Sequence, residues 1–205
     1  MNVFVLTTGR SGSLTFIRAC SHMENYTAGH ESRARKLGEE RFRYPASHIE
    51  ADNRLSWFLG ALDRHYGNDA FYVHLVRNRE DTIRSYNRRW IRNGSLIRAY
   101  CEGIQQIALH RLDRQRRLEV VGDFYDQVNS NIRHFLKDKQ HRMTLSIEKA
   151  GEDFPVFWER IGAEGDLPQA LETFRKQYNR SRKTRMKNFR HECRFMLMKF
   201  RRRVF

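Results

Sequence analysis

Short apolar runs alternate with longer amphipathic stretches along the chain. Residues 2–8 and 70–78 are apolar and rich in β-branched side chains, a pattern typical of strands buried in a parallel sheet. Weaker strand patterns lie at residues 24–32, 47–53 and 143–148. Each run is short enough to be a strand rather than a helix. The sequence therefore predicts five strands.

Helical spacing of apolar residues predicts helices between and after these strands. The predicted helices cover 14–23, 54–67, 80–94, 123–138 and 153–162, with a helical pattern from 95 to 117 and a further helix starting at 165–168. This alternation predicts an α/β fold, a single domain of three layers with a mostly parallel central sheet. Without repeats or a linker, we expect one domain over residues 1–185.

Length and cysteine content narrow the class of protein. The 205 residues suffice for one domain with a core, and no apolar run is long enough to span a membrane. Cys20, Cys101 and Cys193 show neither a disulfide framework nor metal-ligand spacing. The first residues lack the features of a secretory signal. We therefore expect a cytoplasmic protein.

The net charge of +15 is concentrated near the C-terminus. Residues 175–205 contain 13 Lys and Arg and one acidic residue, a net +12, whereas residues 1–174 carry +3. A nearly balanced body argues against specific nucleic-acid binding. Residues 186–205 have the spacing of a basic amphipathic helix. Three roles are open for it: docking on the body, peripheral contact with an anionic membrane, or binding of an anionic polymer or acceptor.

The stretch TTGRSGSLTF, residues 7–16, joins the first strand to the first helix. Gly9 and Gly12 permit backbone conformations in which consecutive N–H groups face an anion. The helix that follows points its positive N-terminus at the same place, and Arg10 adds a fixed charge. The hydroxyl donors of the loop are Ser11, Ser13 and Thr15. The loop favours an anion site, and a plain turn of small residues is the alternative.

A second motif, LVRNREDTIRSY, covers residues 75–86. Arg77 stands at the end of a predicted strand, and Ser85 lies eight positions later on the next helix. Because parallel strands end at the same edge of a sheet, we expect this motif and the loop to face one crevice. Taken singly, Arg77 is better explained as a surface or ion-paired arginine, and Ser85 as an ordinary helix serine.

Together the two motifs resemble those of sulfotransferases that use 3′-phosphoadenosine 5′-phosphosulfate (PAPS). In that family a loop after the first strand holds the 5′-phosphosulfate, and an Arg and a Ser eight residues apart hold the 3′-phosphate. The resemblance covers residues 2–90. It implies a P-loop-like nucleotide-binding core and metal-free transfer of a sulfuryl group to a carbohydrate, lipid or small-molecule hydroxyl. The PAPS-binding residues that it implies are Gly9, Arg10, Ser11, Gly12, Ser13, Leu14, Thr15, Arg77 and Ser85.

The same resemblance implies a catalytic base for the acceptor proton. Glu31, after the second strand, matches the Glu base of several members, and His48 matches a His that follows the third strand in others. Glu50 is a third candidate. Arg10 stands where many members have Lys, and as an arginine it can neutralise charge on the leaving phosphate but not donate a proton. Candidates for a late basic loop on the 3′-phosphate are Arg180, Arg182 and Lys183.

Two other functions stay open. A P-loop kinase or NTPase would have Lys-Ser/Thr after the last loop glycine, where this chain has Ser13-Leu14. It would also need a magnesium-binding acid after a later strand, whereas the strand at 70–76 ends in Arg77. A non-enzymatic polyanion-binding protein would depend on the basic tail and show no nucleotide preference. Acceptor specificity is expected to lie in segments 33–46 and 95–122.

Overall fold

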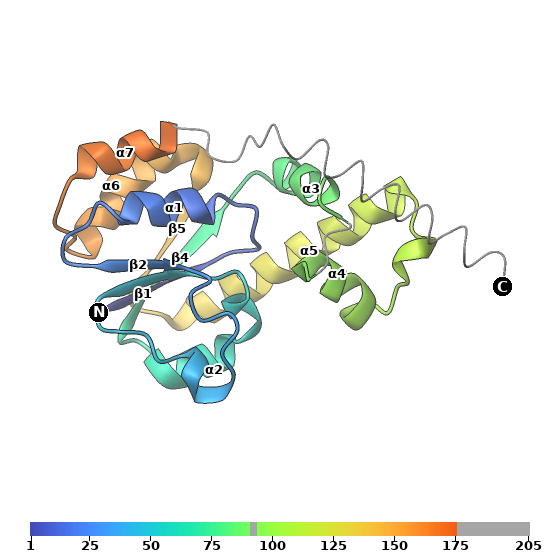
Figure 1. Cartoon of the computed structure of the whole chain (residues 1–205), viewed down its shortest axis with the longest axis horizontal. Helices are drawn as coiled ribbons and strands as arrows, with labels where there is room; N and C mark the ends of the chain where they lie inside the picture. The colour runs from blue at the N-terminus through green and yellow to red at the C-terminus, as the bar shows by residue number, and fades with distance from the viewer. Residues whose placement is uncertain (91–93, 176–205) are drawn as a thin grey trace. The chain divides into compact units, whose positions relative to one another are not determined.

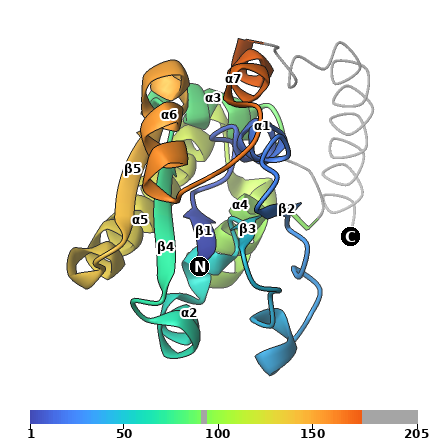
Figure 2. The ribbon, with the colours of Figure 1, turned by 90° about the vertical axis from the view of Figure 1, so that its left-hand side faces the viewer.

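The structure is a computed structural model that describes residues 1–90 and 94–175. Its centre is a five-stranded, all-parallel sheet in the order β2-β3-β1-β4-β5, whose strands lie side by side in Figure 2. The strands are β1 (Asn2–Leu6), β2 (Thr27–His30), β3 (His48–Ala51), β4 (Ala70–Val76) and β5 (Arg142–Ser146). All five predicted strands are confirmed, and the sheet is wholly parallel.

The helices are interspersed with these strands along the chain. The α-helices are α1 (Ser13–Cys20), α2 (Leu59–Tyr66), α3 (Arg79–Asn87), α4 (Leu96–Ala99), α5 (Arg114–Phe135), α6 (Ala150–Arg160) and α7 (Leu167–Arg175). The short 3₁₀ helices are η1 (Gly38–Arg41), η2 (Leu55–Trp57), η4 (Leu109–Arg111), η5 (Leu136–Asp138) and η6 (Ile147–Lys149), and η3 (Tyr100–Ile104) is a π-helical turn.

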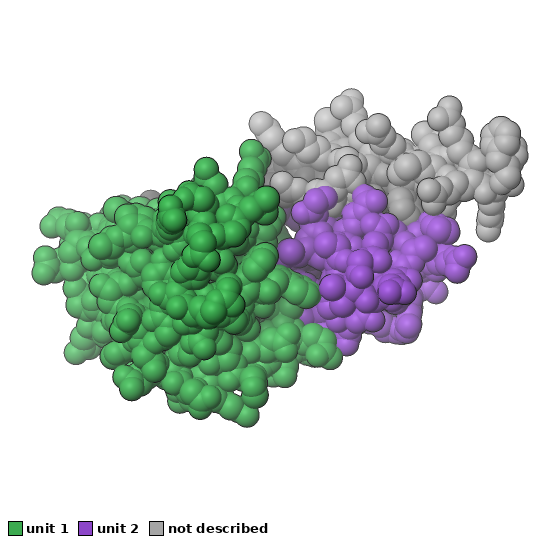
Figure 3. All heavy atoms as spheres, turned by 90° about the horizontal axis from the view of Figure 1, so that it is seen from below, with its two compact units in different colours: residues 1–78, 126–177 green, residues 79–125, 178–205 purple. Residues whose placement is uncertain are grey.

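The chain divides into two compact units, which Figure 3 colours separately. Unit 1 comprises residues 1–78 and 126–177 and contains the whole sheet. Unit 2 comprises residues 79–125 and 178–205, and its described part is helical. In unit 2, Phe124 of α5 packs against Tyr86 and Tyr100, with ring centroids 5.4 and 5.3 Å apart.

In unit 1 one face of the sheet is covered by α1, α6 and α7, which lie together above the strands in Figure 1. Successive side chains of a strand point to opposite faces, so Val3 and Val5 of β1 face these helices. Phe16 of α1 meets Phe154 and Phe157 of α6 at ring-centroid distances of 5.5 and 5.2 Å. This aromatic cluster joins α1, whose first residues follow the β1 loop, to the rest of the core.

The opposite face is covered by α2 and by the end of α5. Phe4 of β1 packs against Tyr66 of α2 and against Tyr44, with ring centroids 4.6 and 5.5 Å apart. Tyr72 of β4 meets Phe135 of α5 edge-on at 5.2 Å. Helices therefore cover both faces of the sheet, which confirms the predicted three-layer α/β architecture.

Several helix boundaries differ from the prediction. The expected helix 54–67 is interrupted at Phe58, so that η2 and α2 are separate. The helical pattern expected over 95–117 is broken, because residues 105–108 are not helical and Gln106 has a left-handed backbone, with φ of 52°. No helix in the described part of the chain is long and apolar enough to cross a membrane. The predicted tail helix 186–205 and the predicted ligands Arg180, Arg182 and Lys183 lie outside the described residues.

Candidate functional site

The carboxyl end of β1 is the point at which the strand order reverses. β1 lies between β3 and β4, and the chain leaves it first for β2 on one side and later for β4 on the other. In open parallel sheets, ligands bind in the crevice outside the carboxyl ends of the strands at such a point. The loop 7–12 lies there.

The backbone of this loop is left-handed at three positions. Gly9, Arg10 and Gly12 have φ values of 81°, 61° and 88°. Such a conformation at the non-glycine Arg10 costs roughly 1–3 kcal/mol, which the surroundings must supply. The backbone N–H groups of residues 11–15 have no hydrogen-bond acceptor within the described part of the chain. Leu14 and Thr15 belong to the first turn of α1, so a set of amide donors and the positive end of a helix coincide.

Hydrogen bonds of buried hydroxyl groups stabilise the loop. The hydroxyls of Thr7 and Ser11 are hydrogen-bonded to each other, and both residues are fully buried. Ser56 donates its hydroxyl to the carbonyl of Thr7 at 3.2 Å. The Ser11 hydroxyl, predicted as a donor to the ligand, is therefore bonded inside the protein, and Ser11 offers its backbone N–H instead.

Gly12 is required by its surroundings as well as by its backbone. A Cβ at this position would lie 2.7 Å from Cγ1 of Ile147 and 2.8 Å from its Cδ1. Ile147 begins η6, directly after β5. The glycine thus lets the β1 loop lie against the chain at the end of β5.

Arg77 follows β4 and contacts the same loop. Its Nη1 donates to the backbone carbonyl of Arg10 at 3.1 Å, so the guanidinium lies beside the left-handed turn. The expectation that these two motifs meet at one sheet edge is confirmed for Arg77. Ser85 is buried in α3, at 3% exposure, and belongs to unit 2. Its pairing with Arg77 on a 3′-phosphate stays a prediction.

The end of β2 adds a histidine and a carboxylate to this edge. His30 is the last residue of β2, and its Nε2 lies 3.0 Å from the hydroxyl of Ser13 at the start of α1. Glu31 has a left-handed backbone with φ of 54°, and its side chain is 36% exposed. Nη1 of Arg54 lies 3.0 Å from Oε2 of Glu31. The Glu31 carboxylate is therefore held at the edge by an arginine that follows β3.

Asp52, directly after β3, anchors that arginine. The Asp52 side chain is fully buried and accepts hydrogen bonds from Nη2 of Arg41 and from the backbone N–H of Arg54, both at 2.8 Å. Burial raises the pKa of Asp52, while the Arg54 amide and the two arginines oppose the shift. Through the Arg54 amide, Asp52 fixes the turn that leads into η2. Sequence reasoning missed Arg41, because nothing in the charged segment 33–46 distinguishes one arginine as the partner of a buried carboxylate.

His48 and Glu50 form a separate, internal cluster. The placement of His48 after the third strand is wrong, since His48 is the first residue of β3 and lies about 10 Å along the strand from its carboxyl end. Its Nδ1 meets the Thr27 hydroxyl at 2.7 Å, and its Nε2 meets Oε2 of Glu50 at 3.1 Å. Glu50 is fully buried and accepts the backbone N–H of Ser32 at 2.8 Å. A Cβ on Gly29 would lie 2.7 Å from the Glu50 carboxylate, so this cluster depends on a glycine in β2.

No family model matches the chain, and no curated protein sequence matches it. Within residues 1–90 and 94–175, no group of three or more His, Cys, Asp or Glu side chains is placed to hold a metal ion. The edge can nonetheless do two things. Its β1 and β4 side offers amides and arginines to an anion, and its β2 and β3 side offers the Glu31 carboxylate to a proton.

Proposed function

We propose that this protein is a PAPS-dependent sulfotransferase that transfers a sulfuryl group to the hydroxyl of an acceptor. The observation that carries the proposal is the β1 loop, in which three left-handed residues precede a helix N-terminus and the Arg10 carbonyl is held by Arg77. A phosphosulfate needs amide donors and fixed positive charge at one place, and this loop supplies both.

On the donor side, the amides of residues 11–15 would bind the 5′-phosphosulfate and Arg10 would neutralise the leaving phosphate. Arg77, together with Ser85, would hold the 3′-phosphate. In the reaction the acceptor oxygen forms a bond to sulfur while the bond between sulfur and the phosphate oxygen breaks. The leaving group is adenosine 3′,5′-bisphosphate, and its developing charge falls on the loop amides and Arg10.

On the acceptor side, Glu31 is favoured as the base. It lies at the carboxyl edge with its side chain partly exposed, whereas His48 and Glu50 lie within β3 and are bonded internally. The Arg54 guanidinium, whose Nη1 lies 3.0 Å from Oε2 of Glu31, limits the orientation of the carboxylate. The acceptor hydroxyl would lose its proton to Glu31 as the new bond to sulfur forms.

The kinase alternative gains little from the geometry. An acid does follow β3, the neighbour of β1, but both oxygens of Asp52 accept hydrogen bonds from Arg41 and Arg54. A magnesium ligand has to direct an oxygen at the phosphates instead. The residues Ser13-Leu14 also stand where a triphosphate-binding loop carries its Lys-Ser/Thr pair.

Calorimetric titration tests the donor site. Wild type is expected to bind adenosine 3′,5′-bisphosphate and to discriminate against ATP and adenosine 5′-phosphate. Arg77→Ala should lower the affinity for the bisphosphate by at least about ten-fold, because a charge-assisted contact is lost. The matched control Arg64→Ala, at an exposed position of α2, should bind as wild type does. Absence of binding, or equal affinity for ATP, would refute the proposal.

Turnover tests the base. With PAPS and a panel of carbohydrate, lipid and small-alcohol acceptors, Glu31→Gln should lower turnover by roughly 100-fold or more, the usual contribution of a general base. Its affinity for the bisphosphate should stay that of wild type. Glu24→Gln, an exposed carboxylate just before β2, is the matched control. Full turnover in Glu31→Gln would remove Glu31 from the mechanism while leaving the donor site intact.

A further inference from the structure

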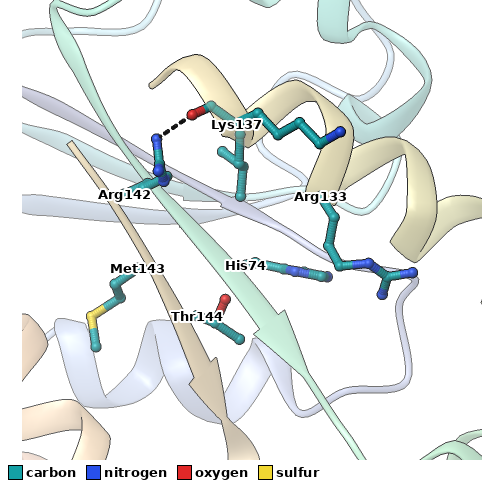
Figure 4. Close-up of a pocket in the computed structure, with 7 residues that line it drawn as sticks. His74, Arg133, Lys137, Arg142, Met143 and Thr144 are labelled. Atoms are coloured by element: carbon teal, nitrogen blue, oxygen red, sulfur yellow. Dashed lines mark hydrogen bonds between the residues drawn. The ribbon is translucent and has the colours of Figure 1, made fainter. Parts of the chain in front are cut away.

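Unit 1 contains a cavity of about 360 Å³ that the proposed reaction does not use. Its lining residues are His74, Arg133, Leu136, Lys137, Arg142, Met143 and Thr144, shown in Figure 4. The floor is the sheet at the paired residues His74 of β4 and Thr144 of β5, and the wall is the end of α5 with η5. None of these residues belongs to the β1 loop or to the Glu31 and Arg77 positions.

The cavity is strongly basic. Arg133, Lys137 and Arg142 line it, and no acidic residue does. Arg133 and Lys137 are exposed, stand one helical turn apart, and have no ion-pair partner within the described part of the chain. Two uncompensated cations at one opening favour an anionic ligand.

The guanidinium of Arg142 is hydrogen-bonded to backbone carbonyls beside the cavity. Its Nη1 donates to the carbonyls of Lys137, at 2.6 Å, and Lys139. These carbonyls lie at the end of η5, where a helical segment presents partial negative charge. With Arg142 bonded to them, the positive side chains of Arg133 and Lys137 dominate at the cavity.

His74 gives the cavity a second kind of contact. The residue is only 2% exposed, and its Nε2 donates to Oδ1 of Asn129 at 2.8 Å. Burial lowers the pKa of His74 despite this hydrogen bond, and Arg133 adds to the lowering, so the ring is neutral at pH 7. With Nε2 protonated, Nδ1 is an acceptor, and it has no hydrogen-bond partner within the described residues. In Figure 4 the ring lies between Thr144 and Arg133.

We propose that this cavity binds a small phosphate or sulfate monoester that also carries a hydroxyl group. The anion contacts Arg133 and Lys137, and the ligand hydroxyl donates to Nδ1 of His74. The volume falls within the range of small-molecule sites, about 300–1,000 Å³. This site is independent of the donor site and of the proposed transfer reaction.

Nuclear magnetic resonance with glycerol 3-phosphate as the probe tests this site. Titration should shift the ring signals of His74 and the amide signal of Thr144. Inorganic phosphate, which offers the anion without a carbon-bound hydroxyl, should bind more weakly, and glycerol should cause no shift. Absence of a His74 shift throughout the millimolar range of glycerol 3-phosphate would overturn the proposal.

Variants separate this site from other anion sites on the protein. Arg133→Gln and Lys137→Gln should each lower the affinity for glycerol 3-phosphate by about ten-fold, since each removes a hydrogen bond to a charged group. Arg64→Gln and Arg77→Ala should leave the His74 titration unchanged, because neither residue lines the cavity. Unchanged affinity in the double variant Arg133→Gln, Lys137→Gln, or loss of affinity in Arg77→Ala, would contradict a distinct site.

Discussion

Arg10 and Glu31 both have left-handed backbones at the carboxyl edge of the sheet, with φ values of 61° and 54°. Each conformation is unfavourable for a residue with a side chain, and it persists only where the surroundings impose it. Arg10 is held through its carbonyl by Arg77, and Glu31 through its carboxylate by Arg54. Two of the four non-glycine residues with a left-handed backbone in the described part of the chain are thus positions to which the proposed reaction gives roles in charge neutralisation and proton transfer.

Gly12 is the position in the loop where adding a single methyl group should lower stability most. Gly12→Ala combines a left-handed φ of 88° with a contact of 2.7 Å to Ile147. We expect the free energy of unfolding, measured by urea denaturation, to fall by about 2–4 kcal/mol. Binding of adenosine 3′,5′-bisphosphate should be lost as well, because the loop amides move.

Two further variants separate the causes in this prediction. Gly60→Ala is the control, since Gly60 lies in α2 with open space around it, and alanine there should stabilise the protein by about 0.5–1 kcal/mol. Ile147→Ala in the Gly12→Ala background should recover the part of the loss that comes from crowding, but not the backbone part. A Gly12→Ala protein as stable as wild type would show that the loop adopts another conformation.

Among the elements, strands were easier to predict than helices. Strands such as β1 and β4 are buried on both faces, so their apolar residues are nearly continuous. The ends of such an apolar run indicate where the strand begins and ends. Over 95–117 the helical spacing persists in the sequence although the helix does not. There the buried side chains of Cys101, Leu109 and Leu112 and the left-handed Gln106 set the path of the chain, and these depend on packing within unit 2.

Helix α6 offers a test of the core at the scale of one element. Phe154 is fully buried and packs against Phe16, Phe157 and other rings, whereas Val156, two residues on, is 48% exposed. Phe154→Ala should lower the free energy of unfolding by about 3–5 kcal/mol. Val156→Ala is the matched control and should change it by no more than about 0.5 kcal/mol. Similar losses in both variants would mean that α6 is not packed on the sheet through this face.

For the molecule as a whole, the fold class followed from the alternation of strands and helices, and the position of the β1 loop followed from the parallel sheet. The hydrogen-bond and ion-pair partners of the site residues could not be predicted from the sequence pattern. Arg54 and Glu31 follow different strands, and the His30 ring at the end of β2 contacts the Ser13 hydroxyl at the start of α1. The periodic pattern of a sequence specifies which residues are buried, but such pairs depend on the register between strands and on side-chain directions.

The dependence of whole-molecule stability on pH should contain a contribution from His74. Burial lowers the pKa of His74 in the folded protein below 6.5, its ordinary value in an unfolded chain. The unfolded state therefore binds the proton more tightly. The stabilisation is complete above pH 6.5 and is lost as the pH falls below that value, with a slope of at most about 1.4 kcal/mol per pH unit. The nearby Arg133 acts in the same direction as burial, because its positive charge also lowers the pKa of His74.

Urea denaturation of wild type and His74→Gln at pH 7.5 and 5.5 measures this contribution. Because glutamine does not titrate, the stability difference between the two proteins should shift by up to about 1.4 kcal/mol in favour of the variant on going to the lower pH. His141→Gln, at an exposed position before β5, is the matched control and should show no comparable shift. A His74→Gln difference that stays constant between the two pH values would mean that His74 takes up a proton as readily in the folded chain as in the unfolded one.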